Sequence, residues 1–582
     1  MKFLRNFAAA LLAISVFFGL GFVLFIITIS ALSSSEKFVV QDNSVLRINL
    51  TRPLADRDFN DDFDSFDFGA GNINRIGTVN LRKALRNAAS DEKIKGVVLY
   101  APGLNGGFAL GQEARQAIAN FKASGKFVWA YAELMTEGGF YMSSVADRRY
   151  ISPEGSLEFN GLGAELTFFK NAFEKLDIEP QIFRVGDYKS AIEPFILEKM
   201  SDANREQMTS MLNSVHSSML ADMSTDLGIS EEELLEITNK MSVRTLDDAI
   251  NLKLITGVLY EDEFEALLAN EIGEEAGDIN WVSYKQYNNA TSSYNKSKNR
   301  VAVIIAEGDI MMGKSQKGLI TPVQYVKELR KARENKNVKA VVFRINSPGG
   351  DALASDLIWR EVVKTAEVKP VIASMSNYGA SGGYYIAMAA DTIVAEPTTL
   401  TGSIGIFGMV FNIGDFLSNK LGITSDAVST GDFSNYITSS RSLTDAEKSI
   451  IQNSVNRGYE TFTTKAAEGR GMAIDDLKAV ASGRVWTGTQ ALDKGLVDVL
   501  GGLPTAIEIA AQKANVLADY KVVYYPAQKT SIEELMEMLS GSAETSAMKA
   551  KLGDLYPYIE LVKSIENAKG VQARMPFEVE WK

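Results

Sequence analysis

A serine in a glycine-rich turn and a distant lysine are the residues whose types best suit nucleophilic chemistry. Ser381 lies in the run Gly-Ala-Ser-Gly-Gly, between a predicted strand and a predicted helix. The free N–H groups at a helix N-terminus carry partial positive charge and favour an anionic nucleophile there. Lys189 lies far upstream, in the run Gly-Asp-Tyr-Lys-Ser-Ala. A serine activated by a neutral lysine predicts acyl transfer.

The scarcity of cysteine and histidine removes most other chemistry. The 582 residues include no cysteine and one histidine, His216, in a segment with helical character. Disulfides, a cysteine nucleophile and metal sites built from Cys or His are therefore excluded, and we expect no cofactor. A lone histidine on a helix is typical of a surface or packing residue. The α/β-hydrolase interpretation of the glycine turn also fails, because no histidine follows Ser381.

A lysine can act as the base only if its environment removes the charge. An ordinary lysine has a pKa of about 10.4, so neutralising it at pH 7 costs roughly 4.6 kcal/mol. Burial in an apolar pocket lowers a lysine pKa by that order. Ile192 and Phe195 lie near Lys189 in the sequence and suit such a pocket. Glu193 would keep the amine charged, so we expect its side chain to point away.

A second glycine turn, Asn-Ser-Pro-Gly-Gly at residues 346–350, follows the preceding predicted strand. If the two strands are parallel neighbours, the two turns lie side by side. The backbone N–H groups of Gly350 and Gly382 would then face one developing oxyanion. A plain tight turn is the alternative interpretation of the same residues.

The chain contains an internal repeat. Four segments of the first half match four segments of the second half in the same order: 91–107 with 335–351, 137–147 with 381–391, 185–191 with 430–436, and 242–255 with 484–497. A displacement that stays between 242 and 245 residues indicates a duplicated domain.

The two copies differ at the positions that carry the chemistry. The first copy has Lys189, but Glu137 stands where the nucleophile should be. The second copy has Ser381, but Ser434 stands where the lysine should be. Neither copy completes a Ser/Lys dyad alone, whereas the two together do. Independent drift in two surface loops is the alternative explanation.

These matches define the domains that we expect. They are 1–44 for the N-terminal anchor, 45–286 for the first repeat, 287–300 for a polar linker, 301–513 for the second repeat and 514–582 for a C-terminal tail. Strand, turn and helix alternate in the repeats, which predicts an α/β fold with a mostly parallel sheet. In the second repeat the pattern predicts a strand at 339–345 and a helix at 352–366.

The N-terminal segment predicts a transmembrane signal anchor. The run from Phe7 to Leu32 lacks charged residues and would span roughly 39 Å as a helix. A bilayer core needs about 30 Å. Lys2 and Arg5 precede the run, so the N-terminus should stay in the cytoplasm and the rest outside it. A signal peptide cleaved near Ser33 is the alternative.

Charge gives two further expectations. The net charge of −13 disfavours nucleic acid as a partner, because phosphate binding needs a basic face. An acidic insertion at residues 56–71 lacks the glycine that a calcium-binding EF-hand loop needs. We therefore expect a solvated loop there and no metal.

Four motifs together resemble one protein family. They are GDYKSAIEPF (186–195), INSPGGDALAS (345–355), NYGASGGYYIAMAAD (377–391) and TLTGSIGIFG (399–408). In these motifs the chain resembles the long, duplicated form of the signal peptide peptidase A (SppA) family. The members of this family are bacterial membrane-bound serine proteases. The resemblance extends from residue 45 to about residue 513, and includes the N-terminal anchor.

The resemblance implies tandem Clp-protease/crotonase-like domains and assigns roles to residues. Ser381 would be the nucleophile, Lys189 the general base, and Ser403 the group that orients the lysine. Gly350 and Gly382 would supply the oxyanion hole. The family also implies a homotetramer on the bacterial inner membrane, with the catalytic domain in the periplasm, that degrades cleaved signal peptides.

Two other functions fit part of the same pattern. A crotonase-type acyl-CoA enzyme would share the fold and the oxyanion hole, and would use a carboxylate base such as Glu137. An inert membrane scaffold would result if the two repeats failed to bring Lys189 and Ser381 together.

Overall fold

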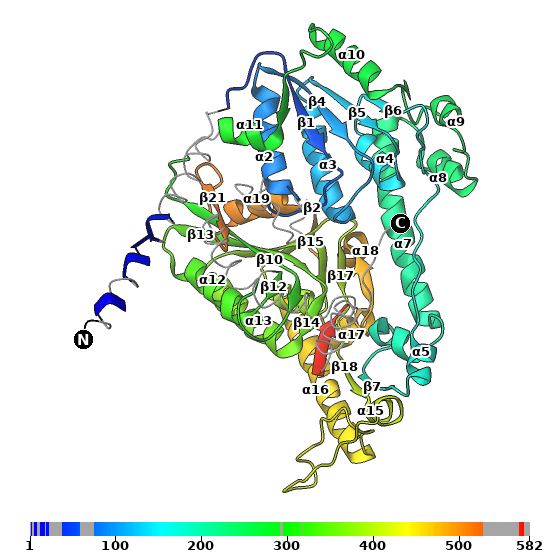
Figure 1. Ribbon diagram of the computed structural model, residues 1–582, viewed down its shortest axis with the longest axis vertical. Coiled ribbons are helices and arrows are strands. Elements are labelled where there is room, and N and C mark those ends of the chain that lie inside the picture. The colour runs from blue at the N-terminus through cyan, green and yellow to red at the C-terminus, as the bar shows by residue number, and fades with distance from the viewer. Residues whose placement is uncertain are drawn as a thin grey trace.

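The computed structural model describes residues 38–58, 75–291, 295–316, 318–527 and 570–575, with a few residues before residue 22. The described chain forms three large sheets with helices packed around them (Figure 1). No helix among these residues is long and apolar enough to cross a bilayer. The predicted anchor at residues 7–32 lies mostly outside the described residues.

The first sheet belongs to the first repeat, and its strands are all parallel. In spatial order they are β8 (Gly257–Val258), β6 (Arg148–Ile151), β5 (Phe127–Ala132), β4 (Ile94–Tyr100), β1 (Ser44–Asn49) and β9 (Trp281–Ser283). The central strand β4 reads as a nearly continuous buried apolar run, as expected for a strand covered on both faces.

The second sheet belongs to the second repeat and carries at its centre the strand β15, which ends just before Ser381. Its path is β19 (Val485–Thr487), β17 (Leu400–Gly402), β15 (Val371–Ala380), β13 (Val338–Ser347), β10 (Arg300–Glu307) and β21 (Lys521–Tyr525), with β16 (Thr392–Ala395) beside β15 and β20 (Val499–Leu500) beside β16. Every pairing except β17 with β19 is parallel. The predicted parallel α/β architecture is confirmed.

The third sheet joins both repeats and the C-terminal tail. In spatial order its strands are β12 (Leu319–Ile320), β11 (Asp309–Ile310), β14 (Gly349–Asp351), β22 (Gly570–Arg574), β18 (Phe407–Asn412) and β7 (Glu179–Arg184). A small pair, β2 (Leu54–Ala55) with β3 (Ile76–Gly77), lies apart. Because β7 comes from the first repeat and β18 from the second, this sheet fixes the repeats relative to each other.

Helices cover the sheets. They are α2 (Thr78–Ser90), α3 (Phe108–Lys122), α4 (Glu137–Ser143), α5 (Lys170–Lys175), α6 (Glu193–Ile196), α7 (Asp202–Leu227), α8 (Glu231–Asn239), α9 (Leu246–Asn251), α10 (Glu261–Ile272), α11 (Tyr284–Ala290), α12 (Pro322–Glu334), α13 (Ala352–Ala366), α14 (Gly382–Ala387), α15 (Gly414–Leu421), α16 (Asp445–Arg470), α17 (Ile474–Val480), α18 (Gly488–Asp493) and α19 (Leu503–Lys513). The helix predicted at 352–366 is confirmed as α13, and the strand predicted at 339–345 lies within β13.

A buried ionic cluster also connects the repeats. Arg344 on β13 is fully buried, and its guanidinium lies 2.7 Å from Asp56 and 2.6 Å from Glu113 of α3. The expectation of a solvated loop at 56–71 is therefore wrong for Asp56 and Asp58, which are both buried. Arg344 of the other repeat supplies the countercharge for Asp56, while Asp58 accepts hydrogen bonds from the Gly77 N–H and the Tyr284 hydroxyl. The local sequence carries no sign of these contacts. Residues 59–74 lie outside the described part of the chain.

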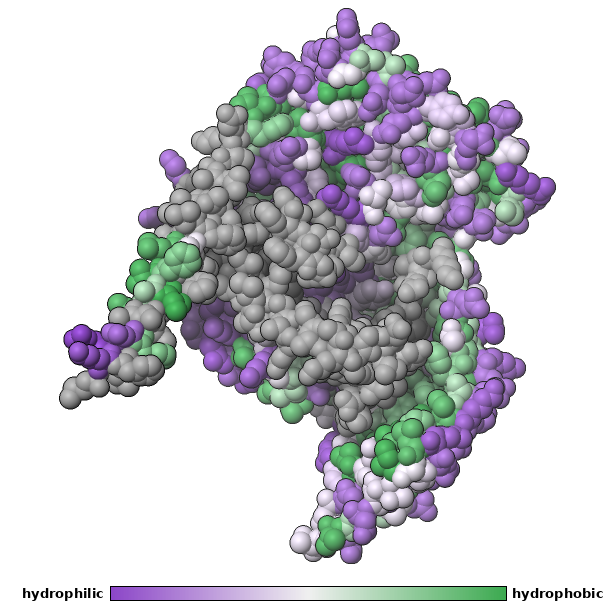
Figure 2. Space-filling model, viewed as in Figure 1, coloured by the Kyte–Doolittle hydropathy of each residue, from purple (hydrophilic) through white to green (hydrophobic). Residues whose placement is uncertain are grey.

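The described surface includes an exposed hydrophobic region. Figure 2 shows hydrophobic residues gathered at the lower right of the molecule, where Figure 1 places α5 and α15. Phe169, Leu176, Leu421 and Ile423 are each at least 43% exposed there. An apolar surface of this kind is typical of contact with a membrane or another protein.

We predict that Asp56→Ala destabilises the fold by about 3–5 kcal/mol, because it leaves the buried Arg344 with an incomplete set of countercharges. Urea unfolding checks this. Glu460→Ala, which removes an exposed partner of Lys478, is the control and should cost under about 1 kcal/mol. Equal unfolding midpoints for the two variants would contradict the prediction.

Candidate active site

Ser381 lies at a strained turn between β15 and α14. Its backbone has φ 54° and ψ −113°, a conformation that residues other than glycine rarely adopt. The Ser381 N–H donates a hydrogen bond of 2.8 Å to the carbonyl of Gly402 at the end of β17. Two neighbouring parallel strands therefore hold the serine at the carboxyl edge of the sheet, before the first turn of a helix.

Lys189 reaches this serine from the first repeat. It follows β7, which pairs with β18 of the second repeat. The Lys189 Nζ lies 2.9 Å from the Oγ of Ser381, 2.9 Å from the Oγ of Ser403 and 3.0 Å from the carbonyl oxygen of Ser403. The structure thus brings together the three side chains that the sequence singled out. The two halves of the chain do meet, contrary to what an inert scaffold would require.

The environment of Lys189 disfavours a charged amine. The side chain is fully buried, and burial holds the pKa of the Lys189 amine well below its ordinary value. Glu193 lies close in sequence, but its carboxylate accepts hydrogen bonds from the Ser201 hydroxyl at 2.6 Å and the Asn204 amide at 2.9 Å. The Nζ of Lys189 is therefore surrounded by neutral oxygen atoms, a setting that suits a neutral base.

The two glycine turns abut, as the strand order predicted. β13 and β15 are parallel, with Ser347 opposite Gly379. Gly349 and Gly350 follow with φ of 108° and 150°, the region that favours glycine. A Cβ on Gly349 would lie 2.7 Å from the backbone nitrogen of Gly382. A side chain at this position would therefore fill the space between the two turns.

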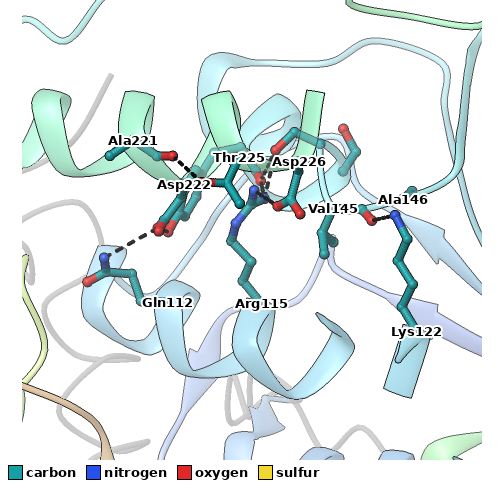
Figure 3. A network of polar contacts seen from close by, with 12 residues as sticks. Gln112, Arg115, Lys122, Val145, Ala146, Ala221, Asp222, Thr225 and Asp226 are labelled. Carbon is teal, nitrogen blue, oxygen red and sulfur yellow. Dashed lines mark hydrogen bonds and ion pairs between the residues drawn. The ribbon is translucent and has the colours of Figure 1, made fainter. Parts of the chain in front are cut away.

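Helix α7 positions the segment that carries Lys189. Near its start, Gln207 donates to the Ser190 hydroxyl at 3.3 Å and accepts from the Val485 N–H at 2.8 Å. Near its end, Figure 3 shows Arg115 of α3 reaching Asp226, and Gln112 reaching Asp222. The helix therefore ties the lysine segment to the body of the first repeat. Sequence reasoning missed these residues because each contact joins distant segments.

The positions that match Ser381 and Lys189 in the opposite repeat hold other residues. Glu137, at the nucleophile position of the first repeat, is buried, and its Oε1 lies 3.3 Å from the Nε2 of His216 on α7. Its other oxygen accepts from the Gly161 N–H at 2.6 Å. Ser434, at the lysine position of the second repeat, is exposed. Glu137 is thus committed to packing contacts within the first repeat.

We predict that Lys189→Met changes how stability depends on pH. Between its lowered pKa and about 10.5, Lys189 is neutral when folded and protonated when unfolded. The unfolded state then binds the extra proton, so wild-type stability rises with pH by up to about 1.36 kcal/mol per pH unit in that window. Lys189→Met should be more stable at neutral pH and lose this slope. Urea unfolding at pH 7, 8 and 9 measures it.

The matched control is Lys199→Met, which replaces an exposed lysine ten residues away. It should keep the wild-type slope. If the Lys189→Met variant keeps that slope as well, the amine is charged in the folded protein and the description of its environment is wrong.

Comparison with known families divides the chain into the same two repeats that the sequence predicted. Residues 120–273 and 364–517 each match the family described as Peptidase family S49. The two matches are displaced by 244 residues, in agreement with the repeat found in the sequence. Among solved structures, a ClpP1 mutant from Listeria monocytogenes aligns with 35% of this chain and 94% of that chain, at 17% identity and a TM-score of 0.24.

Similar proteins cover most of the chain. "Serine protease SPPA, chloroplastic" from Arabidopsis thaliana is 36% identical over 84% of this chain and 72% of its own length. "Protease 4" from Salmonella typhi is 33% identical, over 80% and 76%. "Protease 4" from Haemophilus influenzae is 32% identical, over 88% and 87%. With two family matches and three extensive relatives, this chain belongs to peptidase family S49 and is a serine protease.

Proposed function

We propose that the chain is an endopeptidase whose Ser/Lys dyad is assembled across the two repeats, with Ser381 as nucleophile and Lys189 as general base. The 2.9 Å contact between the Lys189 Nζ and the Ser381 Oγ is the observation that carries this proposal. Geometry of this kind is what proton transfer from a hydroxyl to a base needs. The low pKa that burial gives the amine makes it able to accept that proton.

In the proposed reaction, neutral Lys189 takes the proton of Ser381 as the serine oxygen attacks a peptide carbonyl. The backbone N–H groups of Gly350 and Gly382 stabilise the resulting oxyanion. The protonated lysine then gives its proton to the leaving amine, and water releases the acyl group by the reverse sequence. Ser403 orients the lysine, since its hydroxyl and its carbonyl oxygen both contact the Nζ.

We predict that Ser381→Ala and Lys189→Ala each remove hydrolysis of an apolar signal-peptide substrate. Loss of the general base should lower kcat by about 10²–10⁴-fold, and loss of the nucleophile by at least as much. Ser381→Ala should also abolish labelling by a serine-directed phosphonate. Detergent-solubilised full-length protein is used throughout.

The controls Ser449→Ala and Lys199→Ala change exposed residues of the same types and should keep wild-type rates. Full activity of folded Lys189→Ala would place the base elsewhere. An inert, unlabelled wild type would overturn the proposed mechanism as a whole.

We further propose that residues 7–32 anchor the protein in the bacterial inner membrane, with both repeats in the periplasm. The uncharged run behind Lys2 and Arg5 supports this orientation.

Cleaved signal peptides are the proposed substrates. A relative from Enterococcus faecium whose name includes "signal peptide peptidase SppA" is 29% identical over 51% of this chain and 89% of its own length.

The proposed assembly is a homotetramer, and the exposed apolar surface at α5 and α15 is available for contact with another subunit.

The domain boundaries proposed are those of the sequence repeat, 45–286 and 301–513. Helix α11 extends into the polar linker between them as far as Ala290.

We predict that deletion of residues 7–32 releases the protein from membranes. A single helix of this length is sufficient for stable insertion. Cell fractionation followed by an alkaline carbonate wash distinguishes the two forms, and full-length protein should stay in the pellet. Recovery of the full-length protein in the supernatant would contradict the anchor. A deletion of residues 528–553, which leaves the N-terminus intact, serves as the control.

A further inference from the structure

The strand β15 is irregular just before it reaches the nucleophile. In its pairing with β13, Ile345 lies opposite Met375. Two residues further along β13, Ser347 lies opposite Gly379, which is four residues further along β15. The extra residues of β15 form a bulge, and Asn377 lies in the middle of it. Bulges redirect side chains and are frequent beside active sites. The position of the nucleophile therefore depends on what holds this bulge.

The side chain of Asn377 leaves the second repeat and binds the first. It is only 9% exposed. Its amide nitrogen donates a hydrogen bond to the carbonyl of Gly106, and its Oδ1 accepts one of 3.1 Å from the Leu110 N–H in the first turn of α3. The donor and the acceptor of the amide are thus both bound by the other repeat, where α3 reaches β15 (Figure 1).

A glycine leaves the space that this side chain fills. Gly107 has a φ of 93°, and a Cβ built on it would lie 2.5 Å from the Cγ of Asn377. Any larger residue at this position would therefore displace the asparagine. The turn belongs to the segment 91–107, which matches 335–351, so Gly106 stands where the second repeat has Gly350. The turn that matches the proposed oxyanion turn is thus a socket for the second repeat.

The residue at the matching position of the first repeat differs in type and exposure. At the displacement of 244 residues, Glu133 stands where the second repeat has Asn377, and it is exposed. An ionised carboxylate accepts hydrogen bonds but cannot donate one to a carbonyl, as the amide of Asn377 does. The amide is therefore a feature of the repeat that carries the nucleophile.

The first repeat also holds the residues of β15 that precede the bulge. The guanidinium of Arg344 donates to the hydroxyl of Ser374 at 2.9 Å and to that of Ser376 at 3.1 Å, and it pairs with Asp56 of the first repeat. Together with Asn377, these contacts tie β15 to the first repeat up to four residues before the nucleophile. From there Tyr378–Ala380 pair with β17 and lead directly into the turn.

We propose that Asn377 is a positioning residue, which fixes the bulge of β15 in the glycine turn of the first repeat and thereby sets where the Ser381 hydroxyl lies relative to Lys189. This inference rests on the proposed function, because it takes Ser381 as the nucleophile. The first repeat then positions both members of the dyad, Lys189 through β7 and Ser381 through Asn377. A displacement of about 1 Å at a reacting group can lower a rate by about 100-fold.

The test is Asn377→Ala in full-length, detergent-solubilised protein. The kcat for a signal-peptide substrate should fall by about 10- to 100-fold, while KM stays within about twofold, because the change alters the geometry of attack. Labelling of Ser381 by a phosphonate should slow by a similar factor and still reach one label per chain. Asn419→Ala removes another asparagine that donates to the first repeat, at Asp177, and should keep wild-type rates.

A second variant tests the same contact from the first repeat. Gly107→Ala should lower kcat as Asn377→Ala does, because its methyl group would displace the asparagine. Gly125→Ala is the matched control, since Gly125 has a φ of 85° but no atom within 4 Å of an added Cβ. It should keep wild-type rates. Adding Gly107→Ala to Asn377→Ala should lower kcat little further, because the side chain that it displaces is already absent.

Wild-type kcat and labelling rates in both Asn377→Ala and Gly107→Ala would overturn the positioning role. A smaller labelled fraction with an unchanged rate at each labelled site would overturn it as well, because the contact would then serve folding alone. In both cases labelling of wild-type Ser381 leaves the proposed function intact. Absence of labelling in the wild type would instead overturn the proposed function.

Discussion

The burial of one lysine amine is the constraint around which the site is arranged. An ammonium group in this position would lose most of its hydration, and the nearest carboxylate in sequence, Glu193, is engaged elsewhere. Among the described residues, the hydrogen bonds of the amine go to oxygen atoms of Ser381 and Ser403. The protein therefore holds a group that is most stable when neutral beside a hydroxyl that can lose a proton. In a chain with a single histidine, which lies elsewhere, the proposed dyad uses this amine in place of an imidazole base.

Holding that amine in place requires both repeats. Lys189 follows a strand of the first repeat that pairs with a strand of the second, and α7 binds the same segment from the other side through Gln207. The buried Arg344 cluster fixes the repeats to each other at a separate point. Each copy lacks one member of the proposed dyad, and the interface between the copies positions the two members that are present. Glu137, at the position that matches Ser381, lies 3.3 Å from the Nε2 of His216 on α7.

The third sheet connects this interface to the glycine turn and to the C-terminal tail. Its strands run from the first repeat through the glycine turn, with the tail strand β22 between β18 and β14. With β22 in place, the facing edges of β14 and β18 are both paired, which limits unwanted pairing at these two strands.

A family resemblance implied Ser403, whereas the sequence alone determined the α/β class, the duplication and the identity of Ser381 and Lys189 as partners. These follow from local patterns: apolar strand runs, glycine turns and the complementary divergence of two copies. Tertiary structure decided what no local pattern encodes. The burial of Asp56 depends on Arg344, nearly 300 residues away, so an acidic segment that looked solvated is partly core. The place of β22 depends on edges that exist only once both repeats have folded, because strand pairing follows the free backbone groups it meets and is weakly specified by side chains.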